Sequence, residues 1–171
     1  SSMDGSIHQL LSSYGVSVVS HVPDAGHTAL IRRCENDPAM HTVTLTTEEE
    51  GIALAAGAWL GGARSVVLMQ SSGVGNCCNL MALPRILAGP LLLLITMRGE
   101  WGEENPWQVP TGRAVPALLE TCGVIVHRAD AAEDVAPAVA SACALAYTSG
   151  ERVAVLLGQR LLGAKAFTAE G

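Results

Sequence analysis

The sequence is poor in aromatic and charged side chains. Aromatic residues make up 4% of its 171 residues and charged residues 15%, whereas apolar residues make up 49%. The net charge is −6, and no run of basic residues occurs. Nucleic acids and anionic membranes attract basic surfaces, so neither is an expected partner. An apolar fraction this high predicts instead that another subunit covers part of the surface.

Cysteine pairs at redox or zinc-binding spacing are also missing. The five cysteines are Cys34, Cys77, Cys78, Cys122 and Cys143. Without a C-x-x-C pattern they argue against a disulfide framework or a zinc site and favour a reducing, cytoplasmic compartment. The five histidines show no metal-ligand spacing. His21 and His27 flank a loop, but a structural role is the more common one for such residues. The apolar run 91–95 is far too short to cross a membrane, and no signal-peptide pattern is present.

Hydrophobic periodicity predicts strands that alternate with helices. The expected strands are 16–22, 41–45, 65–69, 91–97, 124–126 and 153–157. The expected helices are 7–14, 27–34, 46–62, 77–87, 113–122 and 133–147. This alternation predicts an α/β domain over 7–160, with a three-layer, mostly parallel sheet of about six strands and helices on both faces. Residues 1–6 are interpreted as a tag remnant or disordered N-terminus, and 161–171 as a tail.

The stretch 46–62 is the most informative part of the chain. It begins with two Thr and three Glu, which suit a helix N-terminus, and it ends with a Gly pair, which suits a helix stop. Its body of Ala, Gly and Leu predicts a helix that is buried on most sides. Its acidic first turn then lies at the edge of the core. A carboxylate there is either a helix cap, the commoner case, or a catalytic group.

Ligands of parallel sheets bind at the carboxyl ends of the strands. The connections expected at that edge are 23–26, 46–48, 70–76 and 98–112. The Gly-rich 73–76 could bind an anion through its N–H groups, although an ordinary strand-to-helix turn has the same pattern. It matches no Walker motif, full dinucleotide fingerprint or nucleophile elbow.

The long connection 98–112 contains two Trp, and arginines lie at and just beyond its ends. Loops of this length are commonly functional or disordered, and the two Trp argue against disorder. Arg98 or Arg113 could bind an acidic substrate group through two parallel hydrogen bonds. The alternative is that these arginines pair with Glu100, Glu103 or Glu104 inside the loop.

Four segments, in this order, resemble the pyrimidine-binding domain of thiamine-diphosphate-dependent 2-oxoacid decarboxylases. They are Val22-Pro23-Asp24, 48–57 with its Ala-Leu-Ala-Ala-Gly, 69–76 (Met-Gln-Ser-Ser-Gly-Val-Gly-Asn), and Arg98-Gly-Glu100 with 108–113 (Gln-Val-Pro-Thr-Gly-Arg). The nearest branch is that of the sulfopyruvate and phosphonopyruvate decarboxylases. Each motif alone is unspecific, but the four in order cover nearly all of 7–160.

The resemblance implies a catalytic role for Glu48, which lies nine residues before Gly57 as in the family. In that family a carboxyl bonded to N1′ of the cofactor's aminopyrimidine favours the imino tautomer, which takes a proton from the thiazolium ring. This role needs a largely desolvated carboxyl that can exchange a proton. Glu49 and Glu50 are interpreted as caps or interface charges.

The resemblance also implies binding residues. The expected cofactor contacts are Thr47, Glu48, Gln70, Ser71, Ser72, Gly73 and Asn76. The expected substrate contacts are Asp24, Ala25, Arg98 and Arg113. Ala25 stands where this branch usually has Ser, and His21 stands where Gly is common. Either departure could alter the substrate or abolish activity.

The family's second signature, a Gly-Asp-Gly followed by an Asn-rich segment that binds Mg²⁺ and diphosphate, does not occur in the sequence. The chain is therefore expected to hold only the pyrimidine end of thiamine diphosphate, inside a hetero-oligomer whose other subunit holds Mg²⁺. The predicted function is the pyrimidine-binding subunit of a two-subunit decarboxylase for sulfopyruvate, phosphonopyruvate or similar 2-oxoacids. Alternatives are a carboligase subunit, a non-catalytic regulatory subunit, and an unrelated small-molecule-binding protein.

Overall fold

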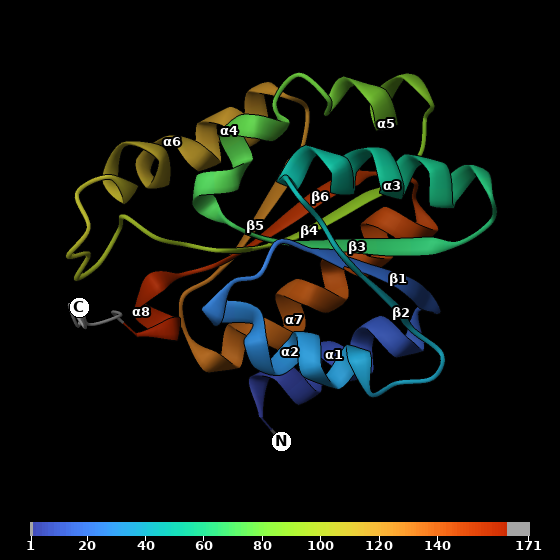
Figure 1. Cartoon of the computed structure of the whole chain (residues 1–171), viewed down its shortest axis with the longest axis horizontal. Coiled ribbons are helices and arrows are strands. Elements are labelled where there is room, and N and C mark those ends of the chain that lie inside the picture. The colour runs from blue at the N-terminus through green and yellow to red at the C-terminus, as the bar shows by residue number, and fades with distance from the viewer. Residues whose placement is uncertain (1, 164–171) are drawn as a thin grey trace.

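Short runs of apolar residues form a six-stranded parallel sheet at the centre of the computed structural model, which describes residues 2–163 (Figure 1). The strands are β1 (Val16–His21), β2 (His41–Thr44), β3 (Arg64–Gln70), β4 (Leu91–Thr96), β5 (Ile125–Ala129) and β6 (Arg152–Leu157). Their order is β2-β1-β3-β4-β6-β5, and every neighbouring pair is parallel. The predicted α/β class is confirmed.

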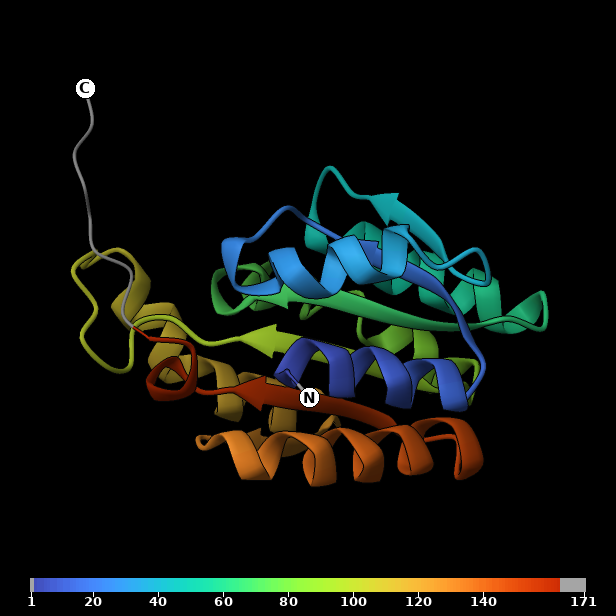
Figure 2. The ribbon, with the colours of Figure 1, turned by 90° about the horizontal axis from the view of Figure 1, so that it is seen from below.

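Helices cover both faces of the sheet, as Figures 1 and 2 show. One face carries α1 (Met3–Ser13), α2 (Thr28–Glu35) and α7 (Ala132–Cys143), which continues into the π-helical turn Ala144–Thr148. The other carries α3 (Glu48–Leu60), α4 (Val74–Cys77), α5 (Ala82–Ile86) and α6 (Gln108–Thr121). The short α8 (Gln159–Leu162) follows β6. No helix within 2–163 is long and apolar enough to cross a membrane.

Strand β4 lies between two separate apolar cores. All six of its residues are buried. Leu92 and Leu94 pack into the core under α1, α2 and α7, whereas Leu91, Leu93 and Ile95 pack into the core under α3, α4 and α6. Successive side chains of a strand point to opposite faces, so an unbroken apolar run is what a strand covered on both sides requires.

Several element boundaries differ from the predicted ones. Helix α1 begins at Met3 because the Ser2 side chain accepts a hydrogen bond from Gly5 N, so 3–6 is helical rather than disordered. The predicted helix 77–87 contains only the last residue of α4 and the short helix α5, with turns between them, and most of α4 lies in the predicted loop 70–76. Helix α6 begins at Gln108, five residues before the predicted start. The predicted tail 161–171 includes the end of α8, and 164–171 lies outside the described residues.

Helix α3 lies directly on the sheet, but only one of its faces is buried. A Cβ at Gly51 would come within 2.7 Å of Val67 Cγ1 and 2.9 Å of Leu45 Cδ1, so glycine allows the close approach. The buried residues of α3 are Gly51, Ile52, Ala55 and Ala56. Leu60, on the outer side, is 69% exposed. The prediction of a helix buried on most sides is therefore wrong for this chain alone, because α3 belongs to an outer layer.

Candidate active site

The Glu48 side chain lies at the carboxyl edge of the sheet, directly against Gly73. A Cβ at Gly73 would overlap Glu48 Cγ and come within 2.5 Å of its carboxyl carbon. Only glycine leaves room for the carboxylate there. Asn76 Nδ2 donates to Glu48 Oε2 at 3.2 Å, and it is the only hydrogen-bond partner of this carboxylate within 2–163. A carboxylate has about four acceptor positions, so most of its bonding capacity is left for a ligand.

Glu48, Glu49 and Glu50 have three different surroundings. Glu50 caps the helix, since its Oε2 accepts from Thr46 N at 3.0 Å. The expected capping by hydroxyls does not occur, because Thr47 holds the N-cap position without a side-chain hydrogen bond. Glu49 Oε2 is buried and has no partner in the described chain, so for Glu49 a capping role is not observed. The capping interpretation is thus confirmed for Glu50.

The segment after β3 supplies the other expected cofactor contacts. Gln70 Nε2 is buried without a hydrogen-bond partner in the part of the chain that the structure describes. Ser71 is fully buried, and its Oγ accepts from Arg98 N at 3.0 Å, so it joins the ends of β3 and β4. Ser72 is exposed at the surface. A Glu48 carboxylate with one hydrogen-bond partner and an unpaired Gln70 N–H group at one sheet edge suit a ring that both accepts and donates hydrogen bonds.

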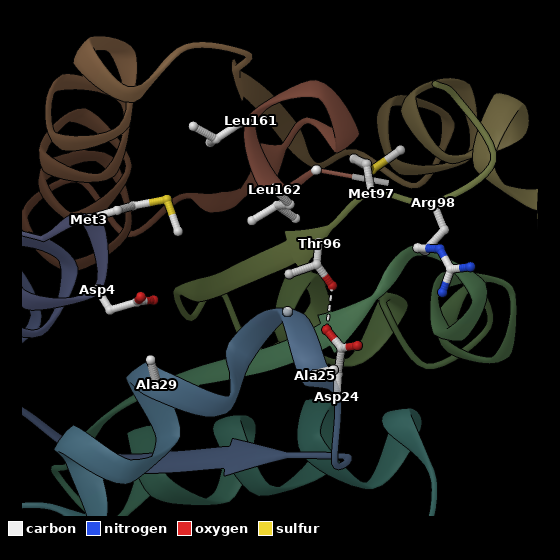
Figure 3. A pocket seen from close by; sticks show the side chains of 12 residues that line it. Met3, Asp4, Asp24, Ala25, Ala29, Thr96, Met97, Arg98, Leu161 and Leu162 are labelled. Carbon is white, nitrogen blue, oxygen red and sulfur yellow. Dashed lines mark hydrogen bonds between the residues drawn. The ribbon is translucent and has the colours of Figure 1, made fainter. Parts of the chain in front are cut away.

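A second feature of this edge is a pocket of about 300 Å³ (Figure 3). It contains Asp24, Ala25 and Arg98, three of the four expected substrate residues. Arg113 does not line it and is exposed on α6. Thr96 Oγ1 donates to Asp24 Oδ2 at 2.6 Å, and Asp4 also lines the pocket. Two carboxylates at one pocket make it unfavourable for an anion unless a cation offsets them.

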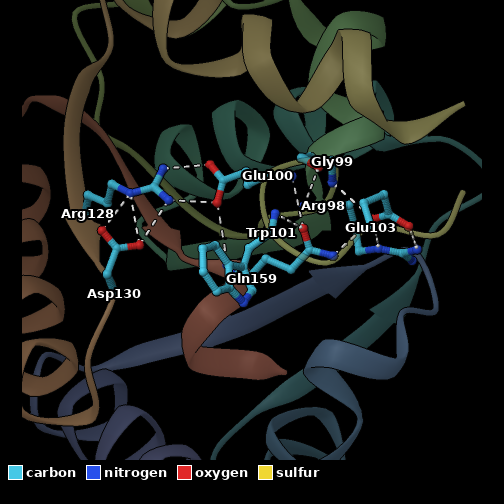
Figure 4. Close-up of polar contacts among 9 residues, drawn as sticks. Arg98, Gly99, Glu100, Trp101, Glu103, Arg128, Asp130 and Gln159 are labelled. Atoms are coloured by element: carbon cyan, nitrogen blue, oxygen red, sulfur yellow. Dashed lines mark hydrogen bonds and ion pairs between the residues drawn. The ribbon is translucent and has the colours of Figure 1, made fainter. Parts of the chain in front are cut away.

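Arg98 does not offset these carboxylates, because Glu103 neutralises its guanidinium (Figure 4). Its Nε and Nη2 donate to the two Glu103 oxygens at 2.7 and 2.6 Å. The Glu103 carboxylate also accepts from Gly99 N, Asn105 N and Gln159 Nε2. The Arg98 pairing, opposed by burial and aided by these N–H donors, lowers the pKa of Glu103 to about 2. For Arg98, the alternative of pairing within the loop is what the structure shows.

Gln159 holds the same loop from the other side. This side chain is 2% exposed, and its Oε1 accepts from Glu100 N and Trp101 N, both at 2.9 Å. The Glu100 carboxylate in turn receives two hydrogen bonds from Arg128, at 2.7 and 2.6 Å. Thr96 and Gln159 were not predicted as site residues. Thr96 ends an apolar strand and Gln159 follows one by two residues. A polar residue at the end of an apolar run is a signal that the sequence contains.

The two histidines near the edge have structural surroundings. His27 is buried, and its Nε2–H is shared between the carbonyl oxygens of Met69 at 3.2 Å and Leu94 at 3.1 Å. Burial lowers the pKa of His27, which favours the neutral ring. Burial also lowers the pKa of His21, whose Nδ1 has no partner among residues 2–163. No three His, Cys, Asp or Glu side chains of that range are grouped as a metal site.

Comparison with known proteins gives both sequence relatives and fold relatives. No protein-family model matches the chain. The sulfopyruvate decarboxylase subunit alpha of Methanocaldococcus jannaschii is 32% identical over 88% of this chain and 89% of that protein. The subunit of the same name from Methanococcus maripaludis is 30% identical over 88% of this chain and 91% of that protein. A phosphonopyruvate decarboxylase of Streptomyces viridochromogenes is 40% identical over 66% of this chain but only 29% of that protein.

Among solved structures, a 2-oxoglutarate:ferredoxin oxidoreductase from Magnetococcus marinus matches with a TM-score of 0.74. The match covers 100% of this chain and 34% of that one, at 15% sequence identity. This likeness supports the fold alone. The sequence relatives are the ones that bear on activity.

Proposed function

We propose, from the premise that this chain belongs to the family of sulfopyruvate decarboxylase α subunits, that it is the pyrimidine-binding subunit of a thiamine-diphosphate-dependent 2-oxoacid decarboxylase. Its relatives are decarboxylases, and the name α subunit implies a further subunit. The observation that carries the proposal is the Glu48 carboxylate, seated against Gly73 with one hydrogen-bond partner in the described chain. A diphosphate-binding subunit would hold the remainder of the cofactor together with Mg²⁺.

Thiamine diphosphate, when bound, supplies the electron sink that a 2-oxoacid needs in order to lose CO₂. Glu48 would hold a ring nitrogen of the cofactor's aminopyrimidine and exchange a proton with it. Asn76 would orient the carboxyl through its hydrogen bond to Oε2, which leaves Oε1 for the ring. Gly73 keeps the space beside the carboxyl open. A proton held at this one oxygen is the chain's own contribution to the chemistry.

The other contacts to the cofactor would come from the ends of β2 and β3. Gln70 Nε2 is a buried donor without a partner in 2–163, and a bound ring could satisfy it. Thr47 and Ser72 stand beside Glu48 and Gly73 in the sequence and would border the ring. Ser71 would act indirectly, because its hydroxyl already bonds Arg98 N.

The proposed substrate is a 2-oxoacid with a second acidic group, sulfopyruvate first and phosphonopyruvate next. Arg98 is paired with Glu103, so Arg113 is the better candidate for binding the second acidic group. Arg113 is exposed, and within 2–163 no ion pair or hydrogen bond holds its guanidinium. Asp24 and Ala25 would border the substrate at the end of β1, where Ala25 brings no hydroxyl to the pocket that it lines.

The test measures CO₂ release by this chain mixed with a candidate diphosphate-binding subunit, thiamine diphosphate and Mg²⁺. Sulfopyruvate, phosphonopyruvate and pyruvate are offered separately. Turnover that needs both chains and the cofactor is expected, with sulfopyruvate the best substrate. The Glu48→Gln variant should lose about 10²- to 10⁴-fold in activity, the range for a positioned proton-transfer group, while the complex still assembles.

Glu50→Gln is the matched control, because an amide oxygen can still accept from Thr46 N, and its activity should change little. Full activity of Glu48→Gln would contradict the catalytic assignment. Turnover without thiamine diphosphate would contradict the whole proposal. An assembled complex that consumes no 2-oxoacid would favour the carboligase or regulatory alternatives.

A further inference from the structure

The five cysteines divide into two groups by burial. Cys34, Cys77 and Cys143 are buried. Burial raises the pKa of their thiols to about 11, 12 and 12, which makes them poor nucleophiles. Cys78 and Cys122 are only partly buried. They are the two cysteines of 2–163 that are not fully buried.

The Cys122 thiol lies against the backbone of Cys78 although 44 positions separate the two residues. Cys78 caps the C-terminus of α4, and Cys122 caps that of α6. The Cys122 thiol donates to the Cys78 carbonyl oxygen, with Sγ 3.8 Å away. The Cys78 thiol donates to Val74 O at 3.6 Å, within its own helix. Burial, together with the neighbouring Cys78 thiol, raises the pKa of Cys122.

We propose that Cys78 and Cys122 form a redox-active dithiol, which hydrogen peroxide converts into a disulfide that joins α4 to α6. One thiolate attacks a peroxide oxygen, the O–O bond breaks, and a sulfenic acid and water form. The second thiolate attacks the sulfenic sulfur, forms the S–S bond and releases a second water after protonation. The two thiols lose two electrons and two protons, and the peroxide is reduced. A dithiol reductant reverses the reaction by thiol–disulfide exchange.

Cys77 is the competing partner, and its surroundings argue against it. Its thiol donates to Gly73 O at 3.4 Å and is buried in the core under α3, α4 and α6. Cys122 packs against the edge of this same core, but its thiol contacts the Cys78 backbone, and Cys77 is the more buried neighbour. Asn76, the donor to Glu48, lies two residues before Cys78. A disulfide at Cys78 would consequently restrain the helix that positions Asn76.

The experiment uses the full chain, treated with hydrogen peroxide under native conditions and then denatured for thiol titration. The number of titratable thiols should fall from five to three and return to five with dithiothreitol. Peptide mapping should recover one cross-linked pair that contains Cys78 and Cys122. Cys78→Ser and Cys122→Ser should each keep their four remaining thiols reduced at the same peroxide dose.

Cys77→Ala is the matched control, and it should still lose two thiols. A Cys77–Cys78 cross-link, or loss of two thiols in Cys122→Ser, would overturn the proposal. Oxidation of single cysteines to sulfinic acid without any cross-link would overturn it as well. Peptide mapping of the unmodified chain keeps the test decisive if a variant fails to fold.

Discussion

Two segments at the same edge of the sheet are held in opposite ways. Glu48 is positioned by packing against Gly73 and has one hydrogen-bond partner in the described chain. Glu103, in the 98–107 loop, accepts hydrogen bonds from four residues: Arg98, Gly99, Asn105 and Gln159. A carboxylate whose acceptor positions are filled is a structural element, whereas one with positions left over can bind a ligand. This difference separates the proposed catalytic carboxylate, Glu48, from a carboxylate that holds a loop, Glu103.

The largest effect is expected where the backbone of the loop 98–107 packs against α6. A Cβ at Gly112 would overlap the Arg98 carbonyl oxygen, and neither backbone can move far. Gly112→Ala should destabilise the fold by about 3 kcal/mol or more, as overpacking against backbone does. Thermal unfolding should show a melting temperature lower by about 6–12 °C. Gly57→Ala, with nothing within 4 Å of its Cβ, is the control and should be neutral or slightly stabilising.

The Glu48 carboxyl can be displaced with little loss of stability. Gly73→Ala would push the Glu48 carboxyl from its position, since the new Cβ would lie 2.5 Å from the carboxyl carbon. Glu48 is only partly buried and can turn toward solvent. Activity of the assembled enzyme should fall about 100-fold, a typical cost of misplacing a catalytic group. Gly75→Ala, in open space two residues further along, should keep its activity, and an equal loss there would show that α4 itself was disturbed.

Removing the charge of Glu103 tests whether that carboxylate is structural. Its side chain is 4% exposed and that of Arg98 14%, so Glu103→Gln leaves a largely buried cation without its counter-charge. The unfolding free energy should drop by about 2–3 kcal/mol, measured by urea denaturation. Glu120→Gln, at an exposed position on α6, is the control and should change it by less than about 0.5 kcal/mol. A similar drop in both variants would show that Glu103 is no more important to the fold than an exposed glutamate.

The pH dependence of the unfolding free energy also tests the role of Glu103. Pairing with Arg98 lowers the folded-state pKa of Glu103 to about 2, against an ordinary 4.5. Its contribution is therefore complete above about pH 5 and is lost as pH falls toward 2. The stability gap between the unmodified chain and Glu103→Gln should narrow by about 1 kcal/mol between pH 7 and pH 3.5. Urea titrations at both pH values measure it, and a constant gap would contradict the lowered pKa.

The smallest effect is expected at Arg128, whose ion pairs with Glu100 and Asp130 lie near the surface. Arg128 is 37% exposed and bonds both Glu100 and Asp130. Glu100→Gln removes one of two carboxylates and leaves the other in place. The melting temperature should fall by no more than about 2–4 °C, corresponding to less than about 1 kcal/mol. A loss as large as that of Glu103→Gln would show that these ion pairs, and not Glu103, hold the loop.

The partner of Arg98 could not be predicted from the sequence. The sequence offered Arg98 two roles, substrate binding or pairing inside the loop, and the structure shows the second. Spacing could not decide between them, because Glu100, Glu103 and Glu104 all lie within reach of Arg98 along the chain. The choice depends on Gln159, which is the first residue of α8 and completes the set of donors around Glu103.

By itself, the sequence determined the α/β class, the near-complete order of strands and helices, and the family. Periodicity and local motifs report on neighbours along the chain, and these features are local. It also pointed to Glu48, through a motif. Only the tertiary structure decided that α3 is covered on one face, that Glu48 rests on Gly73, and that Cys78 meets Cys122. These contacts join residues far apart in the chain, and their distances depend on how layers pack rather than on any one segment.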